Sequence, residues 1–189
     1  MSARAPLLLA AALALTPALA MAAPPTWVVD KAASRLTFAS SVSGQAFTGR
    51  FARWDAAIHF DPKDPAHSDV AATIDITSAS TGNGDRDAEI PDQDWFWTSH
   101  FPRASYVARS FQAAGPGRYV AVGVLTIRGV AKPLNLPFAL AINGAAAHMT
   151  GAITLNRLAF GVGQGEWAAT DTVPANATVN IDLTAHRTP

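Results

Sequence analysis

The 189-residue chain contains no cysteine. Disulfide scaffolds, zinc ribbons, thiol nucleophiles and iron–sulfur sites are therefore excluded, because each of them needs a cysteine sulfur. The same absence excludes a lipoprotein, whose signal ends at a cysteine that becomes acylated.

Charge is also scarce, and it is balanced. Only 15% of the residues are charged, with 14 Lys plus Arg against 14 Asp plus Glu. This balance argues against nucleic acid as a partner, because phosphate binding needs a basic surface. A hydrophobic fraction of 49% is too high for a disordered segment. Length and composition together indicate one globular domain.

Long hydrophobic runs are absent except near the start, where residues 5–29 carry no charge and are rich in Ala and Leu. A basic start, an apolar core and small residues ending at Ala20 or Ala22 are typical of a cleavable export signal. The apolar core is about ten residues long, short of the roughly 20 that a membrane-spanning helix needs. We therefore expect a signal peptide at 1–22, a mature domain at 23–189 without a transmembrane segment, and export of that domain.

The dominant pattern in the rest of the chain is an alternation of apolar and polar residues with period two, which predicts β-strands. The alternation is cleanest at Val70–Thr77 and Val179–Thr184. Short strands separated by turn residues indicate an antiparallel sandwich or barrel of about eight strands. Less regular alternation places the remaining strands at residues 35–42, 54–60, 105–113, 118–128, 134–142 and 147–158.

Residues 85–105 depart from this alternation and are rich in acidic and aromatic side chains. Asp94 is a suitable N-cap for a helix that begins at Trp95, and Pro102 would end it. The segment predicts one or two short helices. Helices of that length are not stable alone, so we expect them to dock on the sheet or over the mouth of a barrel.

Two arrangements are open for the interior of such a barrel. Eight strands enclose a space that side chains can fill or that a small ligand can occupy. Strand 118–128 is apolar on both faces, and Ala and Gly are frequent at strand positions where a filled core would use Leu or Phe. These two features favour a ligand, but the pattern alone leaves a packed core equally open.

Motifs for catalysis or metal binding are scarce. The five histidines lack H-x-H and H-E-x-x-H spacing, so no metal site is expected. The glycines of 161–165 lack the lysine of a P-loop and predict a bend, while the acids of 85–94 lack the glycine of a calcium loop. An enzyme site has only three weak candidates: Arg86, Asp87 and Asp94.

The segment GVLTIRGVAKPLNLP, residues 123–137, resembles the signature of the YceI family of polyisoprenoid-binding, lipocalin-like periplasmic proteins. Residues 41–62, 74–87 and 94–110 resemble, in the same order, the opening hairpin, the third strand, and the helix with its following strand. A departure occurs at 88–91, where many members carry a His and an Arg. The resemblance implies a single-domain, all-β, extended lipocalin-like barrel of about eight antiparallel strands around an apolar tunnel.

The function that this resemblance implies is a carrier or sequestering protein for a long-chain isoprenoid lipid, polyprenyl or ubiquinone-type, without catalytic residues. It implies a periplasmic location and no cofactor beyond the bound lipid, and it allows a homodimer. Two alternatives are a ligand-free stress-response or interaction protein, with an exposed apolar patch and a filled interior, and an enzyme that works inside the barrel. The residues expected to line the tunnel are Phe38, Phe51, Trp54, Ile58, Phe60, Ile74, Ile76, Trp95, Phe96, Phe101, Phe111, Leu125, Ile127, Phe138, Ile153, Phe160 and Trp167.

Overall fold

The computed structural model describes residues 23–188, so the expected signal peptide lies outside the described residues. The strands in chain order are β1 (Thr26–Val29), β2 (Arg35–Val42), β3 (Gln45–Phe51), β4 (Trp54–His59), β5 (Asp69–Asp75), β6 (Ala79–Ser80), β7 (Arg103–Ala113), β8 (Arg118–Ile127), β9 (Val130–Asn143), β10 (Ala146–Asn156) and β11 (Asn176–Arg187). The helices are α1 (Gly84–Glu89) and the 3-10 turns η1 (Pro65–His67), η2 (Ile76–Ser78), η3 (Arg157–Phe160) and η4 (Gly165–Ala168).

Eight antiparallel strands close into a barrel in the order β1-β4-β5-β7-β8-β9-β10-β11, and β1 pairs with β11 to complete the ring. The short strand β1 closes the barrel because Trp27 pairs with Ile58 of β4 on one side and with Arg187 of β11 on the other. This arrangement confirms the predicted all-β barrel.

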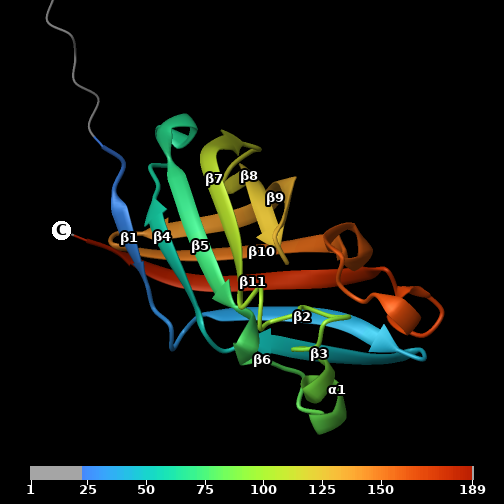
Figure 1. Cartoon of the computed structure of the whole chain (residues 1–189). Coiled ribbons are helices and arrows are strands. Elements are labelled where there is room, and N and C mark those ends of the chain that lie inside the picture. Colours follow the sequence, from blue (N-terminus) through green and yellow to red (C-terminus); the bar gives the residue numbers. More distant parts are fainter. Residues whose placement is uncertain (1–22, 189) are drawn as a thin grey trace, which may run out of the picture.

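The remaining strands extend the sheet beyond the barrel. Strand β11 pairs along its length with β10, while its other edge pairs first with β2, at residues 178–182, and then with β1, at residues 185–187. Strand β2 continues the sheet through β3 to β6. Figure 1 shows β2 and β3 beside the long strand β11, with α1 next to β3 at that end of the molecule. The barrel is therefore lengthened on one side by a hairpin.

Ser34 fixes the turn that lets β1 and β2 share one edge of β11. Its hydroxyl donates to the carbonyls of Asp30 and Thr184 and accepts from the Thr184 amide, at 2.6, 3.3 and 3.0 Å. Ser34 is buried, so its hydroxyl and the backbone groups that it contacts hydrogen-bond to each other in place of water.

Each predicted strand is present, but the pattern missed β1, β3 and β6. Strand β1 has four residues and β6 has two, which is too short for an alternation to be recognised. Strand β3 contains Gly49, which faces the ring of Phe38 on β2 so closely that a Cβ there would clash with it.

The helix predicted from Trp95 onward is wrong. The helix of this region is α1, which begins after Asn83, whose side chain accepts from the Arg86 amide at 3.0 Å. Residues 91–101 form consecutive turns, and Trp97 has a φ of 48°, which a right-handed helix cannot contain. The carbonyl of Asp94 accepts instead from amides of a distant loop, so tertiary contacts replace the helical hydrogen bonds.

Candidate functional site: an apolar barrel cavity

The barrel encloses a cavity of about 300 Å³, which we call the barrel cavity. All eight barrel strands and the β2–β3 hairpin contribute side chains to it, and they do so at every second position. Alternation therefore points one complete face of each strand inward. Two strands show this most fully, with Leu134, Leu136, Phe138, Leu140 and Ile142 from β9, and Ala177, Val179, Ile181, Leu183 and Ala185 from β11.

The space exists because several inward positions carry alanine. Ala56 of β4 and Ala72 of β5 pair directly across the sheet and both line the barrel cavity. A side chain that ends at Cβ leaves empty volume where a packed core would place Leu or Phe. The other alanines of the lining are Ala104, Ala121, Ala147, Ala177 and Ala185.

Besides Arg157, which is described below, two polar side chains of the lining donate to backbone carbonyls. Trp27 Nε1 donates to Phe60 at 2.9 Å, and the Tyr106 hydroxyl lies 2.9 Å from the Ala121 carbonyl and 3.1 Å from that of Leu134. Burial raises the pKa of Tyr106 to about 12, so the phenol stays neutral. Because both donors are already hydrogen-bonded to the backbone, neither is available to bind water in the cavity. The interior therefore suits an apolar ligand.

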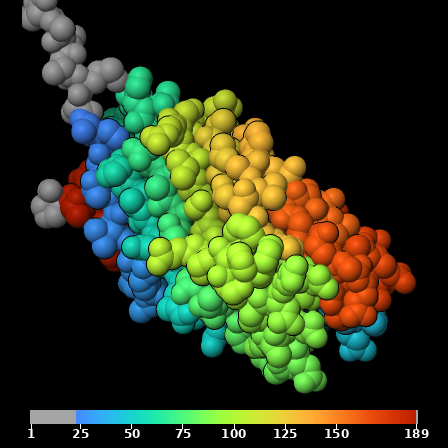
Figure 2. All heavy atoms as spheres, viewed as in Figure 1, coloured from blue at the N-terminus to red at the C-terminus, as the bar shows by residue number. Residues whose placement is uncertain are grey.

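A second space of about 400 Å³, the mouth pocket, lies between the β2–β3 hairpin, α1 and the loops that follow α1 and η3. In Figure 2 the segment after β6, drawn in green, packs across one end of the barrel next to the orange segment that follows β10. The mouth pocket is lined by Phe38, Ser40, Val42, Phe47, Thr81, Asn83, Asp85, Arg86, Glu89, Ile90, Trp95, Phe96, Arg157, Val162, Trp167, Val173 and Ala177. Five of these also line the barrel cavity, so the two spaces are adjacent and share part of their wall: Phe38, Phe96, Arg157, Val162 and Ala177.

The polar rim of the mouth pocket is held by Asp87 of α1. Its carboxylate accepts from the Ser80 hydroxyl at 2.8 Å and from the amide and hydroxyl of Thr81 at 2.6 Å each. The Thr81 hydroxyl contributes most to holding the pKa of Asp87 below its ordinary value. Arg86 lies with its guanidinium 4.2 Å from the ring centre of Phe47, and its Nε donates to the Thr81 hydroxyl.

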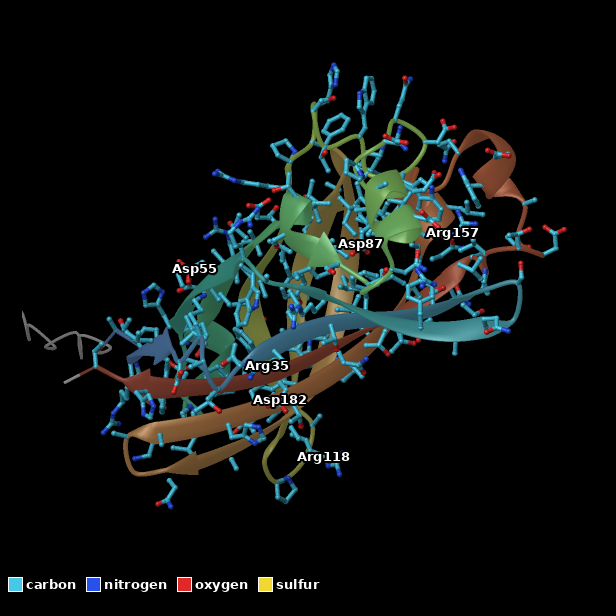
Figure 3. All side chains as sticks on the ribbon, turned by 90° about the horizontal axis from the view of Figure 1, so that it is seen from below. Arg35, Asp55, Asp87, Arg118, Arg157 and Asp182 are labelled. Atoms are coloured by element: carbon cyan, nitrogen blue, oxygen red, sulfur yellow. The ribbon has the colours of Figure 1, made fainter. Side chains whose placement is uncertain are left out.

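Arg157 is a buried cation at the junction of the two spaces, with only 7% of its surface exposed. Figure 3 shows it in the same part of the molecule as α1 and Asp87. Burial lowers the pKa of the guanidinium. All of its nitrogens donate to backbone, and the acceptors, at 2.6–3.5 Å, are the carbonyls of Val162, Gly163, Trp167, Ala169, Val173 and Pro174. Arg157 therefore folds the 161–175 loop around itself.

Local sequence lets the chain turn in this way. The Asn156 side chain accepts from the amides of Leu158 and Ala159 and so begins η3, and Gly161, with a φ of 70°, ends it. The loop then docks on the segment before β7, because the amides of Gly163 and Gln164 donate to the Asp94 carbonyl at 2.8 and 2.7 Å.

The predicted lining residues divide between the two spaces. Trp95 and Trp167 line only the mouth pocket, with ring centres 5.5 Å apart. Phe101 lines neither space, because its ring packs against Trp97, at 5.8 Å between centres, and beside Gly129. The others line the barrel cavity: Phe38, Phe51, Trp54, Ile58, Phe60, Ile74, Ile76, Phe96, Phe111, Leu125, Ile127, Phe138, Ile153 and Phe160. Ligand binding by these residues stays a prediction.

Sequence reasoning missed Ser40, Tyr106 and Arg157. Ser40 alternates with Phe38 on β2, which is a usable signal for a shared face. Tyr106 and Arg157 had no local signal, because their partners lie far along the chain or in a loop that they organise themselves.

The weak enzyme candidates do not form one cluster at the cavity. Arg86 lines the mouth pocket, whereas neither Asp87 nor Asp94 is part of either lining. Within residues 23–188, no three acidic or histidine side chains lie close enough together to hold a metal ion. In the same range, no helix is both long enough and apolar enough to cross a membrane.

A closed barrel around an apolar cavity defines a lipocalin-like ligand-binding fold. The YceI-like domain model matches residues 27–185, and the chain belongs to the YceI family. A UPF0312 protein of Shewanella sp. (strain ANA-3) is 31% identical over 167 residues, which cover 83% of this chain and 84% of that protein. A UPF0312 protein of Pseudomonas syringae pv. tomato is 30% identical, over 92% of this chain and 93% of the relative. For a third UPF0312 protein, from Photorhabdus laumondii, the match is 35% over 88 residues and spans only 45% of the relative.

Solved structures share the fold. BcnA of Burkholderia cenocepacia superimposes with a TM-score of 0.80 at 31% identity, over 82% of this chain and 98% of BcnA. A domain from Saccharophagus degradans described as polyisoprenoid-binding superimposes with a TM-score of 0.71 at 17% identity, over 87% of this chain and 99% of that domain.

Proposed function

We propose that this protein is a periplasmic carrier or sequestering protein that holds a long-chain isoprenoid lipid, of the polyprenyl or quinone type, in the barrel cavity. The observation that carries the proposal is the apolar barrel cavity, which shares Ala177 and Phe38 of its wall with the mouth pocket. A chain molecule can lie in the barrel with one end at the mouth. The expected export signal supports the periplasmic part of the proposal.

The lining supplies the binding energy. Burying one methylene contributes roughly 0.8 kcal/mol, so ten methylenes contribute about 8 kcal/mol, which offsets the several kcal/mol cost of association. Among the described side chains that line the barrel cavity, only Arg157 is charged, and its nitrogens already donate to carbonyls. The barrel therefore selects length and apolarity rather than charge.

Binding rather than catalysis is the activity that this interior supports best. A reacting group would need a polar side chain with a free proton or lone pair in the barrel cavity. Tyr106 and Trp27 both donate to the main chain, and burial holds Tyr106 neutral. The Saccharophagus degradans domain has the same fold and is described as polyisoprenoid-binding; for this chain the lipid class is part of the proposal.

Native mass spectrometry of the protein purified from its own host, followed by organic extraction, tests the proposal. We expect one long-chain apolar lipid per protein molecule. Ala177→Phe should reduce lipid occupancy at least tenfold, because the added ring takes up space at the wall that the barrel cavity shares with the mouth pocket. Ala152→Phe is the matched control, since Ala152 lies on the exposed face of β10 and should leave occupancy unchanged.

Recovery of empty protein, together with no uptake of an added isoprenoid hydrocarbon by folded protein, would overturn the proposal. Equal occupancy in the Ala177→Phe and Ala152→Phe variants would also contradict it, because the lipid would then lie outside the cavity.

A further inference from the structure

The charges of the chain balance overall, but they are separated along it. Residues 54–94 contain ten acidic residues against two basic ones, whereas residues 95–165 contain six basic residues and no acidic one. In the sheet, β4 and β5 belong to the first range, and the strands that follow them, β7, β8 and β9, belong to the second. The barrel wall therefore carries acidic side chains on one side and basic side chains on the adjoining side.

We call the outer surface of β7, β8 and β9, together with the turn that joins β8 to β9, the basic face. Figure 2 shows these strands side by side, drawn from yellow-green to amber. Its cations are Arg103, Arg109, Arg118 and Arg128, of which the first three are exposed. Within residues 23–188 none of the four forms a salt bridge, so their charge is available to an external partner.

Acidic side chains beside the basic face bind partners that lie outside it. Asp75 of β5 is paired across the sheet with Arg103, but its carboxylate accepts from Arg53 Nε at 2.8 Å. Asp64 precedes η1, which packs against β7, and its carboxylate lies 2.7 Å from His67 Nδ1. The basic face therefore keeps its charge up to its border with β5.

Apolar side chains lie between the cations. Val107 of β7, Val124 of β8 and Pro133 of β9 are successive cross-strand partners and form one row across the basic face. Tyr106 and Leu125 line the barrel cavity, so alternation places Val107 and Val124 on the outside. Val124 keeps 43% of its surface exposed. An anionic membrane surface matches both features, because apolar side chains enter the interface while cations are attracted by the lipid charge.

Two other kinds of partner fit the basic face less well. Strand β9 pairs with β10 only from Phe138 onward, so one edge of residues 130–137 pairs with no strand of the described chain. A strand of a second protein would add there through amides, and Pro133 and Pro137 have none. Nucleic acid would gain from the cations but not from the valines between them, because its backbone is polar and charged.

We propose that the basic face is a docking surface for an anionic phospholipid membrane. Arg103, Arg109 and Arg118 attract the lipid phosphates. Val107 and Val124 enter the interface between head groups and acyl chains. The acidic side of the wall, at β4 and β5, is repelled by the same surface, and this repulsion orients the molecule. The inference does not depend on what the barrel cavity holds, because these side chains point away from it.

Docking through the basic face also positions the mouth pocket. Arg128 follows β8, and its Nη1 donates to the carbonyl of Trp95, a residue of the mouth-pocket lining, at 3.0 Å. The Arg128 guanidinium lies 5.8 Å from the ring centre of Trp97, and indole rings favour the membrane interface. The mouth pocket therefore lies beside the membrane in the docked molecule.

Sedimentation of the full mature protein with phospholipid vesicles tests the inference. Vesicles that mix phosphatidylcholine with phosphatidylglycerol should bind the protein. Vesicles of phosphatidylcholine alone should bind it at least about tenfold more weakly, and added salt should release it. Arg103→Gln, Arg109→Gln and Arg118→Gln combined should weaken binding to the anionic vesicles about a hundredfold, at about fivefold for each charge.

The matched control combines Arg50→Gln, Lys63→Gln and Arg187→Gln. These three residues are exposed and lie outside the basic face, so both triple variants have the same net charge. The control should bind within about threefold of the wild type, because charges farther than about 8 Å from the membrane are screened at physiological salt. Val124→Ser tests the apolar contribution without changing the charge, and it should weaken binding about three- to tenfold.

Equal losses of vesicle binding in the two triple variants would overturn the inference, because net charge rather than the basic face would then govern binding. Absence of vesicle binding, together with salt-dependent dimers or with binding of a DNA duplex, would overturn it as well and would assign the basic face to a second copy or to nucleic acid.

The lipid-binding function is tested separately with Ala177→Phe, which takes up space in the barrel cavity. This variant should lose lipid occupancy and still bind anionic vesicles. Loss of vesicle binding in folded Ala177→Phe would overturn the docking inference, because the protein would then hold the vesicles through its cavity. Vesicle binding by a protein that never takes up an isoprenoid would overturn only the lipid-binding function.

Discussion

The guanidinium of Arg157 occupies the space in which any other residue at position 163 would carry its Cβ, and its Nη1 donates to the Gly163 carbonyl at 3.2 Å. Gly163 also has a φ of 79°, in the left-handed region. Backbone conformation and side-chain position therefore both require glycine there.

Gly163→Ala should lower the free energy of unfolding by about 3 kcal/mol, because left-handed strain of about 1–2 kcal/mol adds to displacement of the guanidinium. Urea unfolding measures the change. Gly144→Ala is the matched control, because Gly144 has a φ of 61° but no neighbour within 4 Å of the new Cβ. Equal losses of unfolding free energy in the two variants would contradict this prediction, because displacement of the Arg157 guanidinium would then add nothing to the backbone strain.

Arg157→Met should destabilise the fold by about 3 kcal/mol or more, because it leaves a set of inward-facing carbonyls without a donor. Arg157→Lys should give a stability between those of the wild type and Arg157→Met. An ammonium keeps three donors but lacks the planar fork of the guanidinium. Guanidinium unfolding followed by tryptophan fluorescence measures both effects. The control is Arg118→Met, an exposed arginine on β8, with an expected change within about 0.5 kcal/mol.

Alkaline pH should destabilise the barrel through Tyr106. Its pKa is about 12 in the folded state against about 10 in the unfolded chain, so the folded state retains the proton longer. The stabilisation is complete below about pH 10 and is lost as the pH rises toward 12, by at most about 1.4 kcal/mol per pH unit. The urea concentration at the midpoint of unfolding should fall in the wild type as the pH rises across this range. It should fall less in Tyr106→Phe. Tyr119→Phe, which keeps Tyr106, should behave like the wild type.

Acid pH should loosen the rim of the mouth pocket through Asp87. The Thr81 hydroxyl, as the largest cause, holds the pKa of Asp87 below its ordinary value. Such a carboxylate stabilises the folded state above its unfolded pKa, near 4, and this contribution disappears as the pH falls through the folded pKa. Asp87→Asn should remove that part of the acid dependence in urea unfolding. Asp85→Asn keeps the hydrogen bonds between Asp87 and Thr81 and should retain the wild-type profile.

The sequence predicted the strands well where alternation was long. In β5 and β11, period-two alternation fixed both the strand and its inward face, because successive side chains point to opposite sides of a sheet. Prediction from sequence failed between Asp85 and Ser105, where local capping signals favoured a helix at Trp95. Hydrogen bonds from Arg128 and from the 161–175 loop to this segment decided the backbone instead.

Alternation by itself determined an antiparallel β domain whose strands each present one apolar face, while a packed core and an internal cavity stayed equally open. Only the tertiary structure decided that the interior holds a cavity, because the free volume depends on the sum of side chains from every barrel strand. It also decided which residues line the mouth pocket. Phe38, Trp95 and Arg157 lie far apart along the chain and line one pocket only because β2 pairs with β11 and the 161–175 loop docks on the Asp94 carbonyl.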